Sequence, residues 1–447
     1  MSIQSQLVMI AWIPIVFYLF LRFKTQEAVI ISFIVAWLFL PQNAGFSFPG
    51  LPDYERISAT VYGILLATIV YDIQRISKFD YSWLDLPIVI WCICPIFSSL
   101  SNGLGIYDGI SESLSQTVAY GGPYFLGRIY LNNLAGLRKL AIGIFLSGLV
   151  YIPLCLYEIR MSPQLHQIVY GYHGNPSFYQ TIRYGGFRPT VFMQHGLSVG
   201  MWMMAATLIG ICLWRTGVIK QIYGFHIRWF VGILLVTFIL IKSTGAYGLL
   251  LLGLIFLYLA WYFRTSIAFL LLIVAMVFYL QQSISANTYM TDSIITTVSR
   301  IVPDPERIHS LQFRFDNEEI LSAKARERMI LGWGGWGRSR VYDYDWKGDL
   351  VDISITDSLW IIAFGKNGLV GLVSVFGSII IPVLYFCLKY FPANTWTHQK
   401  IAAAAVLTII TVLYMLDCLL NNQFNPIFTL ANGGITGLIV ERAKSKS

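Results

Sequence analysis

The sequence carries little charge. Only 12% of its 447 residues are Asp, Glu, Lys or Arg, whereas 56% are hydrophobic. A soluble domain has roughly twice that share of charge. Apolar runs of about 17–22 residues recur along the chain, each long enough to cross a hydrocarbon core of roughly 30 Å. This composition excludes an ordinary soluble domain and predicts an all-α polytopic membrane protein.

Motifs for metal, nucleotide and redox chemistry are also lacking. All six cysteines lie inside apolar runs, so neither a disulfide framework nor a zinc site is expected. The chain has no P-loop, G-x-G-x-x-G turn, H-E-x-x-H helix or paired-carboxylate metal site. We therefore expect no cofactor and no metal, and any chemistry has to draw on a donor that is already activated.

The net charge of +8 does not indicate nucleic acid as a partner. Much of it lies in short loops between apolar runs, where basic residues set the orientation in the lipid bilayer. The first run, 7–21, has no basic region before it and no cleavage site after it, so we expect it to be retained. The basic loops mark the cytoplasmic side of the membrane. The opposite side receives acidic or weakly charged loops and two long segments, 158–192 and 283–356.

These patterns predict about 12–13 transmembrane helices. The expected spans are 7–22, 27–41, 58–73, 85–100, 115–131, 139–157, 193–213, 229–243, 246–262, 266–281, 357–388 with a break at 365–368, 399–419 and 426–441. We divide the chain into a bundle at 1–281, a large, partly helical periplasmic loop at 282–356, and C-terminal spans at 357–447. The expected location is the bacterial inner (cytoplasmic) membrane.

The sequence does contain one long polar segment, 283–357. It holds two lysines, the motif LGWGGWG at 331–337 and seven arginines, Arg300, Arg307, Arg314, Arg326, Arg328, Arg338 and Arg340. Pro305 can open a helix, residues 317–328 favour its continuation, and the glycines of 332–337 end it. A single large loop rich in arginine and aromatic residues is the natural place to look for chemistry.

A second polar cluster, RYGGFRPTVFMQHG at 183–196, precedes a central apolar run. Arg183 and Arg188 can form an anion clamp, because guanidinium groups offer paired donors to phosphate and keep their charge. The alternative is that both arginines reach to the membrane interface. His195 is either a hydrogen-bonded packing residue, which the pattern favours, or a base.

Three further positions have two interpretations each. Asp357 stands directly before an apolar run, where it can be a general base or the N-cap of a helix. Lys242 ends a span, where it can snorkel to the interface, the favoured interpretation, or reach an anionic substrate. Arg314 stands among acidic residues on a predicted helix, and taken alone it indicates solvated ion pairs.

The order of these motifs resembles the O-antigen ligase and O-antigen polymerase superfamily, whose membrane fold is similar to that of C-type glycosyltransferases. The resemblance covers residues 180–375. It consists of an arginine at a central span, Ser243-Thr-Gly-Ala246, SLQFR at 310–314, LGWGGWG, and an acid followed eleven residues later by GLVGL at 368–372. The ligase branch has His-Asn where this chain has Asp357-Ser358, and many members have Arg where it has Thr244.

The resemblance implies inverting, metal-independent transfer of a glycan from undecaprenyl pyrophosphate to an acceptor sugar hydroxyl. Arg188 and Arg314, with Arg183 or Lys242, would hold the pyrophosphate. Asp357 would activate the hydroxyl. Trp333 and Trp336 either stack on sugar rings or belong to an interfacial aromatic belt. The two departures favour a polymerase of surface or exopolysaccharide repeat units over an O-antigen ligase acting on lipid A core.

Two other classes remain open: a transporter of an anionic or lipid-linked substrate, and a non-catalytic scaffold of a polysaccharide assembly complex. Whether a separate chain-length regulator acts with the protein also stays open. The expected partners are the lipid-linked oligosaccharide donor, the glycan acceptor and the lipid bilayer.

Overall fold

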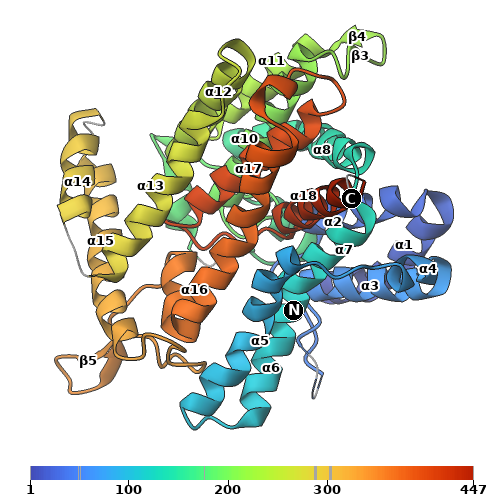
Figure 1. The fold of residues 1–447 in the computed structure, drawn as a ribbon. Helices are drawn as coiled ribbons and strands as arrows, with labels where there is room; N and C mark the ends of the chain where they lie inside the picture. The colour runs from blue at the N-terminus through green and yellow to red at the C-terminus, as the bar shows by residue number, and fades with distance from the viewer. Residues whose placement is uncertain are drawn as a thin grey trace.

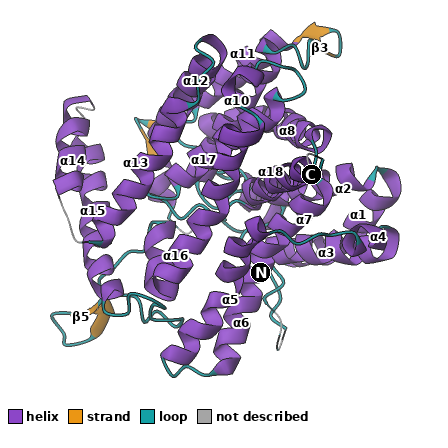
Figure 2. Ribbon diagram, in the orientation of Figure 1, coloured by secondary structure: helices purple, strands orange, loops and turns teal. Residues whose placement is uncertain are grey.

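A computed structural model describes residues 2–48, 50, 52–175, 177–285, 289–301 and 305–445, without the side chains of residues 289, 290, 301, 306, 307 and 310. Arg307 therefore lies outside the side chains described. Within these ranges the chain is almost entirely helical, and its strands form three small antiparallel hairpins (Figure 2). The absence of an extended sheet agrees with the prediction of an all-α protein.

The N-terminal part contains nine α-helices in the described ranges. They are α1 (Ile3–Arg22), α2 (Thr25–Phe39), α3 (Arg56–Tyr71), α4 (Ile73–Ser77), α5 (Leu86–Ser101), α6 (Ile106–Gln116), α7 (Gly122–Tyr130), α8 (Leu134–Met161) and α9 (Leu165–Tyr170). A π-helical turn, Thr117–Gly121, connects α6 to α7. The predicted span 115–131 therefore corresponds to this turn together with α7.

The central part combines two hairpins with four helices. They are β1 (Ile182–Arg183), β2 (Gly186–Phe187), α10 (Gly196–Arg215), β3 (Gln221–Ile222), β4 (Phe225–His226), α11 (Ile227–Leu240), α12 (Thr244–Tyr262) and α13 (Ile267–Ile284). In the β1–β2 hairpin, Ile182 pairs with Phe187 and Arg183 with Gly186.

The C-terminal part holds the polar segment and the last helices. They are α14 (Tyr289–Ile301), α15 (Pro305–Arg326), β5 (Tyr342–Tyr344), β6 (Leu350–Asp352), α16 (Leu359–Tyr385), α17 (Ala402–Asp417) and α18 (Pro426–Lys444). α15 begins at Pro305, the residue from which the sequence predicts a helix. In Figure 1, α14 and α15 lie on the flank of the molecule beyond α13, away from α1 and α3.

Seven helices in the described ranges are long and apolar enough to cross a membrane, and the chain is thus a multi-pass membrane protein. Their bounds are Ile3–Arg22, Trp83–Ser101, Leu134–Met161, Gly196–Arg215, Thr244–Tyr262, Ile267–Ile284 and Leu359–Tyr390. Four further apolar helices, α2, α3, α11 and α17, are shorter. Every range that the sequence predicts as a span falls on a helix.

The helices α10, α17 and α18 form the centre of the bundle. In the apolar part of α10, 89% of the residues are buried inside the protein. This is expected of a helix that is apolar on all sides. α18 packs closely on α7, because a Cβ at Gly433 would lie 1.9 Å from the Tyr124 carbonyl oxygen. Small residues allow such close approach between helices in membranes.

α16 is broken where the sequence predicts, because Gly368 has φ 64° and ψ −160°. The polar segment fills the break with its own backbone. Trp333 N–H donates to the Gly365 carbonyl and Gly334 N–H to the Lys366 carbonyl, each at 2.9 Å. In return, the N–H groups of residues 369 and 370 donate to the carbonyls of residues 329 and 330. We call these four hydrogen bonds the clasp. They satisfy backbone groups that a broken membrane helix would otherwise leave without partners.

Candidate functional site

A buried carboxylate shapes the segment that enters α10. Glu158, near the end of α8, accepts the backbone N–H of Leu165 at 2.9 Å, of Thr190 at 2.8 Å and of Val191 at 2.7 Å. A carboxylate that receives several N–H donors fixes the loop containing them. Two of these bonds fix Thr190 and Val191, which follow Arg188 and Pro189 in the sequence. They therefore fix the path of the chain between Arg188 and His195.

Arg188 is buried, with 4% of its surface exposed. Its guanidinium donates to Ser243 Oγ at 3.2 Å, and its backbone N–H donates to the Thr181 carbonyl at 2.7 Å. Ser243, which opens the Ser-Thr-Gly-Ala sequence before α12, is itself buried. A buried guanidinium held in this way is oriented, unlike one that reaches to the interface.

Lys242 joins the same region from the turn between α11 and α12. Its Nζ donates to the Tyr184 carbonyl at the tip of the β1–β2 hairpin, at 3.1 Å. The Tyr184 hydroxyl lies 3.0 Å from Thr244 Oγ1. The structure therefore places Lys242 against the hairpin that carries Arg183, where it holds the tip of the hairpin to α12.

His195 is the N-cap of α10, and both of its ring nitrogens are engaged. Nδ1 accepts the Leu197 N–H at 3.1 Å, and Nε2 lies 3.0 Å from Gln180 Oε1. Burial lowers the pKa of His195 to about 4, with further lowering by the charges of Arg188, Arg183 and Arg314, in that order. The geometry is that of a neutral, hydrogen-bonded histidine, as the sequence favours over a base.

Three arginines from distant segments act electrostatically on His195, which places each of them in the neighbourhood of this ring. Arg183 and Arg188 come from the hairpin region before α10, whereas Arg314 comes from α15 in the polar segment. We call these three residues the arginine cluster. Cations held in one region repel one another, and nearby carboxylates or a bound anion reduce this repulsion.

Asp357 lies beside this cluster. Its Oδ2 is 3.8 Å from Arg314 Nε, and the two side chains are 46% and 27% exposed. The N-cap of α16 is Ser358 rather than Asp357. The interpretation of Asp357 as the N-cap of this helix is therefore wrong, because the neighbouring Ser358 holds that position. The carboxylate is free to meet solvent or a substrate hydroxyl while Arg314 stays next to it.

A second carboxylate, Glu318, lies one helical turn after Arg314 on α15 and is buried. It accepts hydrogen bonds from the Tyr279 hydroxyl at 2.7 Å and the Trp360 indole N–H at 3.1 Å. Burial raises the pKa of Glu318 to about 6, although the donors and Arg314 oppose the shift. Glu318 connects α15 to α13 and α16, so it positions the helix that carries Arg314.

Asp417 completes the region and was not singled out by the sequence. It ends α17, accepts from Asn421 Nδ2 at 2.9 Å, and interacts electrostatically with Arg314 and Arg188. Its only signal in the sequence is an acid at the end of an apolar run, the same signal that marks Asp357. Ser243 and Glu158 likewise stand in the sequence without any sign of their partners.

The two tryptophans of LGWGGWG lie elsewhere. The Trp333 indole N–H donates to the Lys324 carbonyl at 2.8 Å, and Lys324 Nζ lies 4.0 Å from its ring centroid. Ten residues of α15 separate Lys324 from Arg314, roughly 15 Å along a helix axis. Trp336 is 78% exposed and donates to Asp108 Oδ2 at 3.1 Å. The structure thus places Trp333 at the clasp, not beside the arginine cluster.

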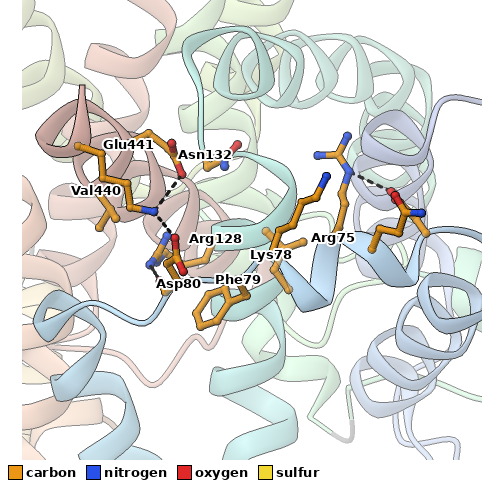
Figure 3. Close-up of a pocket in the computed structure, with 12 residues that line it drawn as sticks. Arg75, Lys78, Phe79, Asp80, Arg128, Asn132, Val440 and Glu441 are labelled. Atoms are coloured by element: carbon orange, nitrogen blue, oxygen red, sulfur yellow. Dashed lines mark hydrogen bonds and ion pairs between the residues drawn. The ribbon is translucent and has the colours of Figure 1, made fainter.

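A cavity of about 440 Å³ lies at the C-terminal end of α18, and none of these residues lines it (Figure 3). It contains no member of the arginine cluster. Among the described residues, no group of three or more His, Cys, Asp or Glu side chains is placed to hold a metal ion.

The arrangement can therefore bind an anion at the arginine cluster and present the Asp357 carboxylate beside it. Of the residues that the sequence singles out, the structure brings together Arg183, Arg188, His195, Arg314 and Asp357. No protein-family model and no curated protein matches this chain.

Proposed function

We propose that the protein transfers a glycan from undecaprenyl pyrophosphate to an acceptor sugar hydroxyl, polymerising repeat units of a surface or exopolysaccharide. In this proposal the shorter apolar helices also cross the bacterial inner membrane, and segment 282–356 lies on the periplasmic side. The observation that carries it is that Arg183, Arg188 and Arg314 all act electrostatically on His195 at the start of α10, while Asp357 lies 3.8 Å from Arg314. The resemblance in motif order to the O-antigen ligase and polymerase superfamily supports the same function.

The arginine cluster suits a pyrophosphate better than a carboxylate or a neutral ligand. Guanidinium groups bind phosphate oxygens in pairs and keep their charge at every physiological pH. Arg188 is already buried and oriented by Ser243, so little rearrangement is needed when charge develops on the leaving group. Arg314 approaches from the polar segment, and the two would enclose the pyrophosphate between α10 and α15.

The reaction is a single displacement. The acceptor hydroxyl oxygen forms a bond to the anomeric carbon of the donor glycan while the bond from that carbon to the pyrophosphate oxygen breaks. The electron pair of the broken bond stays on the pyrophosphate, where Arg188 and Arg314 stabilise it. The hydroxyl proton passes to the Asp357 carboxylate and then to water, to which this half-exposed side chain is open. Attack opposite to the leaving group inverts the anomeric centre.

The test is reconstitution of the full chain in nanodiscs with an undecaprenyl-pyrophosphate repeat unit, in the presence of EDTA. We expect a ladder of longer glycans by gel and mass spectrometry. Arg314→Ala and Asp357→Asn should each lower the rate by at least about 100-fold, the range for losing one charge-stabilising or proton-transfer group. Arg340→Ala is the matched control, because Arg340 pairs with Asp352 at 2.6 Å in the same segment.

Other outcomes would reassign the function. A single transfer to lipid A core, without a ladder, would identify a ligase. A donor that stays intact with either acceptor, repeat unit or lipid A core, but moves across the bilayer would identify a transporter. Equal loss of activity in the Arg340 control and in the Arg314 variant would show that the charge of the segment matters and not the cluster.

A further inference from the structure

The cavity of about 440 Å³ at the C-terminal end of α18 is enclosed by four separate elements. The end of α3, the short helix α4, the end of α7 and the end of α18 all contribute to its lining, so segments more than 300 residues apart meet there (Figure 3). Its volume lies within the range of about 300–1,000 Å³ that is typical of small-ligand sites. Four basic and three acidic side chains line it.

Most of these charges are paired. Arg75 Nε lies 2.9 Å from Asp72 Oδ2, and Lys444 pairs with Asp80. Glu441 is 4.0 Å from Lys444. Lys78, in contrast, forms no ion pair with a carboxylate within the described ranges. Once the Arg128–Asp85 pair is counted, the cationic and anionic side chains around the cavity balance, so the feature that remains is the charge of Lys78, unpaired among the described residues. Lys78 and Arg75 are labelled next to each other in Figure 3.

Arg128 gives the cavity a rigid wall. Its guanidinium binds Asp85 with both Nε, at 2.7 Å, and Nη2, at 2.9 Å, and Tyr124 donates to the same carboxylate at 2.9 Å. Arg128 lies in the last turn of α7, where a basic residue is expected to reach to the membrane interface. It is instead 4% exposed, while Asp85 is fully buried. Because Asp85 balances its charge, this guanidinium is already paired and leaves an incoming anion to the other cations of the lining.

Exposed apolar residues stand next to the cavity-lining residues in the sequence. Tyr71 ends the apolar helix α3, and Trp83 begins the membrane span Trp83–Ser101, with 44% and 55% of their surfaces exposed. Between them, α4 exposes Ile73 and Ile76. Exposed aromatic and aliphatic residues beside basic ones mark the height of lipid headgroups.

We propose that this cavity binds a phosphate group, carried by a phospholipid headgroup or free in solution. Lys78 and Arg75 take the phosphate oxygens, and the Arg128–Asp85 pair forms the fixed wall behind them. The charge of Lys78, which no carboxylate of the described residues pairs with, favours an anionic headgroup over a zwitterionic one. The cavity is separate from the arginine cluster, so this site does not depend on the proposed transferase function.

The experiment uses the full chain in detergent. Native mass spectrometry measures retention of phosphatidylglycerol against phosphatidylcholine, and calorimetry measures binding of inorganic phosphate. The test variant is Lys78→Ala with Arg75→Ala, and Lys78→Arg keeps the charge. The control is Lys220→Ala with Arg228→Ala, two exposed basic residues outside the cavity. Circular dichroism checks that every variant is folded.

Two results would support the site. Preferential retention of phosphatidylglycerol, weakened at least about tenfold in the test variant but not in the control or in Lys78→Arg, identifies a lipid headgroup. Phosphate binding with the same variant pattern, but without lipid preference, identifies a soluble phosphate. Absence of both kinds of binding, or equal weakening in test and control variants, overturns the proposal.

Discussion

Arg188 and Ser243 are joined by a hydrogen bond of 3.2 Å between two buried side chains that are 55 positions apart in the sequence. The bond links the segment before α10 to the start of α12. It orients the guanidinium without neutralising it, because a hydroxyl has no charge. Arg188 is thus held in place at the arginine cluster, where it also interacts electrostatically with Asp417.

Ser243→Ala should lower glycan transfer by about 10-fold to 100-fold, since a hydrogen bond to a charged group contributes roughly 1.5–3 kcal/mol. We expect the fold to be kept, and the loss to fall on turnover more than on donor affinity. Steady-state kinetics in nanodiscs checks this. Ser374→Ala is the control, because Ser374 bonds only carbonyls of its own helix. Full activity of the Ser243 variant would contradict the positioning role.

Glu158→Ala should release the segment before α10. Three backbone N–H groups would lose their acceptor, and we expect a stability loss of roughly 3 kcal/mol or more. Cleavage by trypsin after Arg183 should become faster, which thermal unfolding alone would not reveal. Glu27→Ala is the control, since the exposed pair with Lys139 contributes less than about 1 kcal/mol. Unchanged cleavage would argue against the anchor.

Gly368→Ala should disrupt the clasp. A Cβ there would lie 2.3 Å from the Ile330 carbonyl, and the positive φ with ψ −160° is a conformation that only glycine adopts readily. We expect a loss of about 3 kcal/mol or more in thermal unfolding. Gly377→Ala, in the same helix, would meet only ordinary contacts at 3.8 Å and should have little effect. Equal effects of both substitutions would contradict this.

His195 should make stability depend on acid pH. Its pKa is about 4 in the folded protein against the usual 6.5, so the folded state favours the neutral ring. This contribution is fully present above pH 6.5 and is lost as the pH falls from 6.5 toward 4. His195→Asn keeps an N-cap acceptor but does not titrate. Unfolding temperatures of both proteins across that range should show the difference shrinking as the pH falls.

The helices were predictable because long apolar runs have few other stable arrangements in a membrane. The break in α16 was predictable for a similar reason, since the Gly365-Lys-Asn-Gly368 sequence combines two glycines inside a span. The helix at Pro305 followed from the residue types that come after it. In each case the signal is local, and the structural consequence is local as well.

The partners of the site residues were not predictable in the same way. Glu158 has the same appearance in the sequence as any acid at the end of a span, and only the folded loop shows that it holds backbone N–H groups. Trp333 was expected to stack on sugars or join an aromatic belt. Its ring lies under Lys324 because the glycines around it fold back into the break of α16. Such contacts depend on tertiary structure that no single sequence motif encodes.

The clasp has a mechanical consequence. The chain that follows α15 supplies the hydrogen bonds that α16 lacks, so the polar segment is fastened to a membrane helix through its main chain. Separating the segment from α16 would break these four backbone hydrogen bonds. Leaving the backbone groups without partners in an apolar environment would cost roughly several kcal/mol. The polar segment and α16 are therefore joined as one unit at the non-helical residue Gly368.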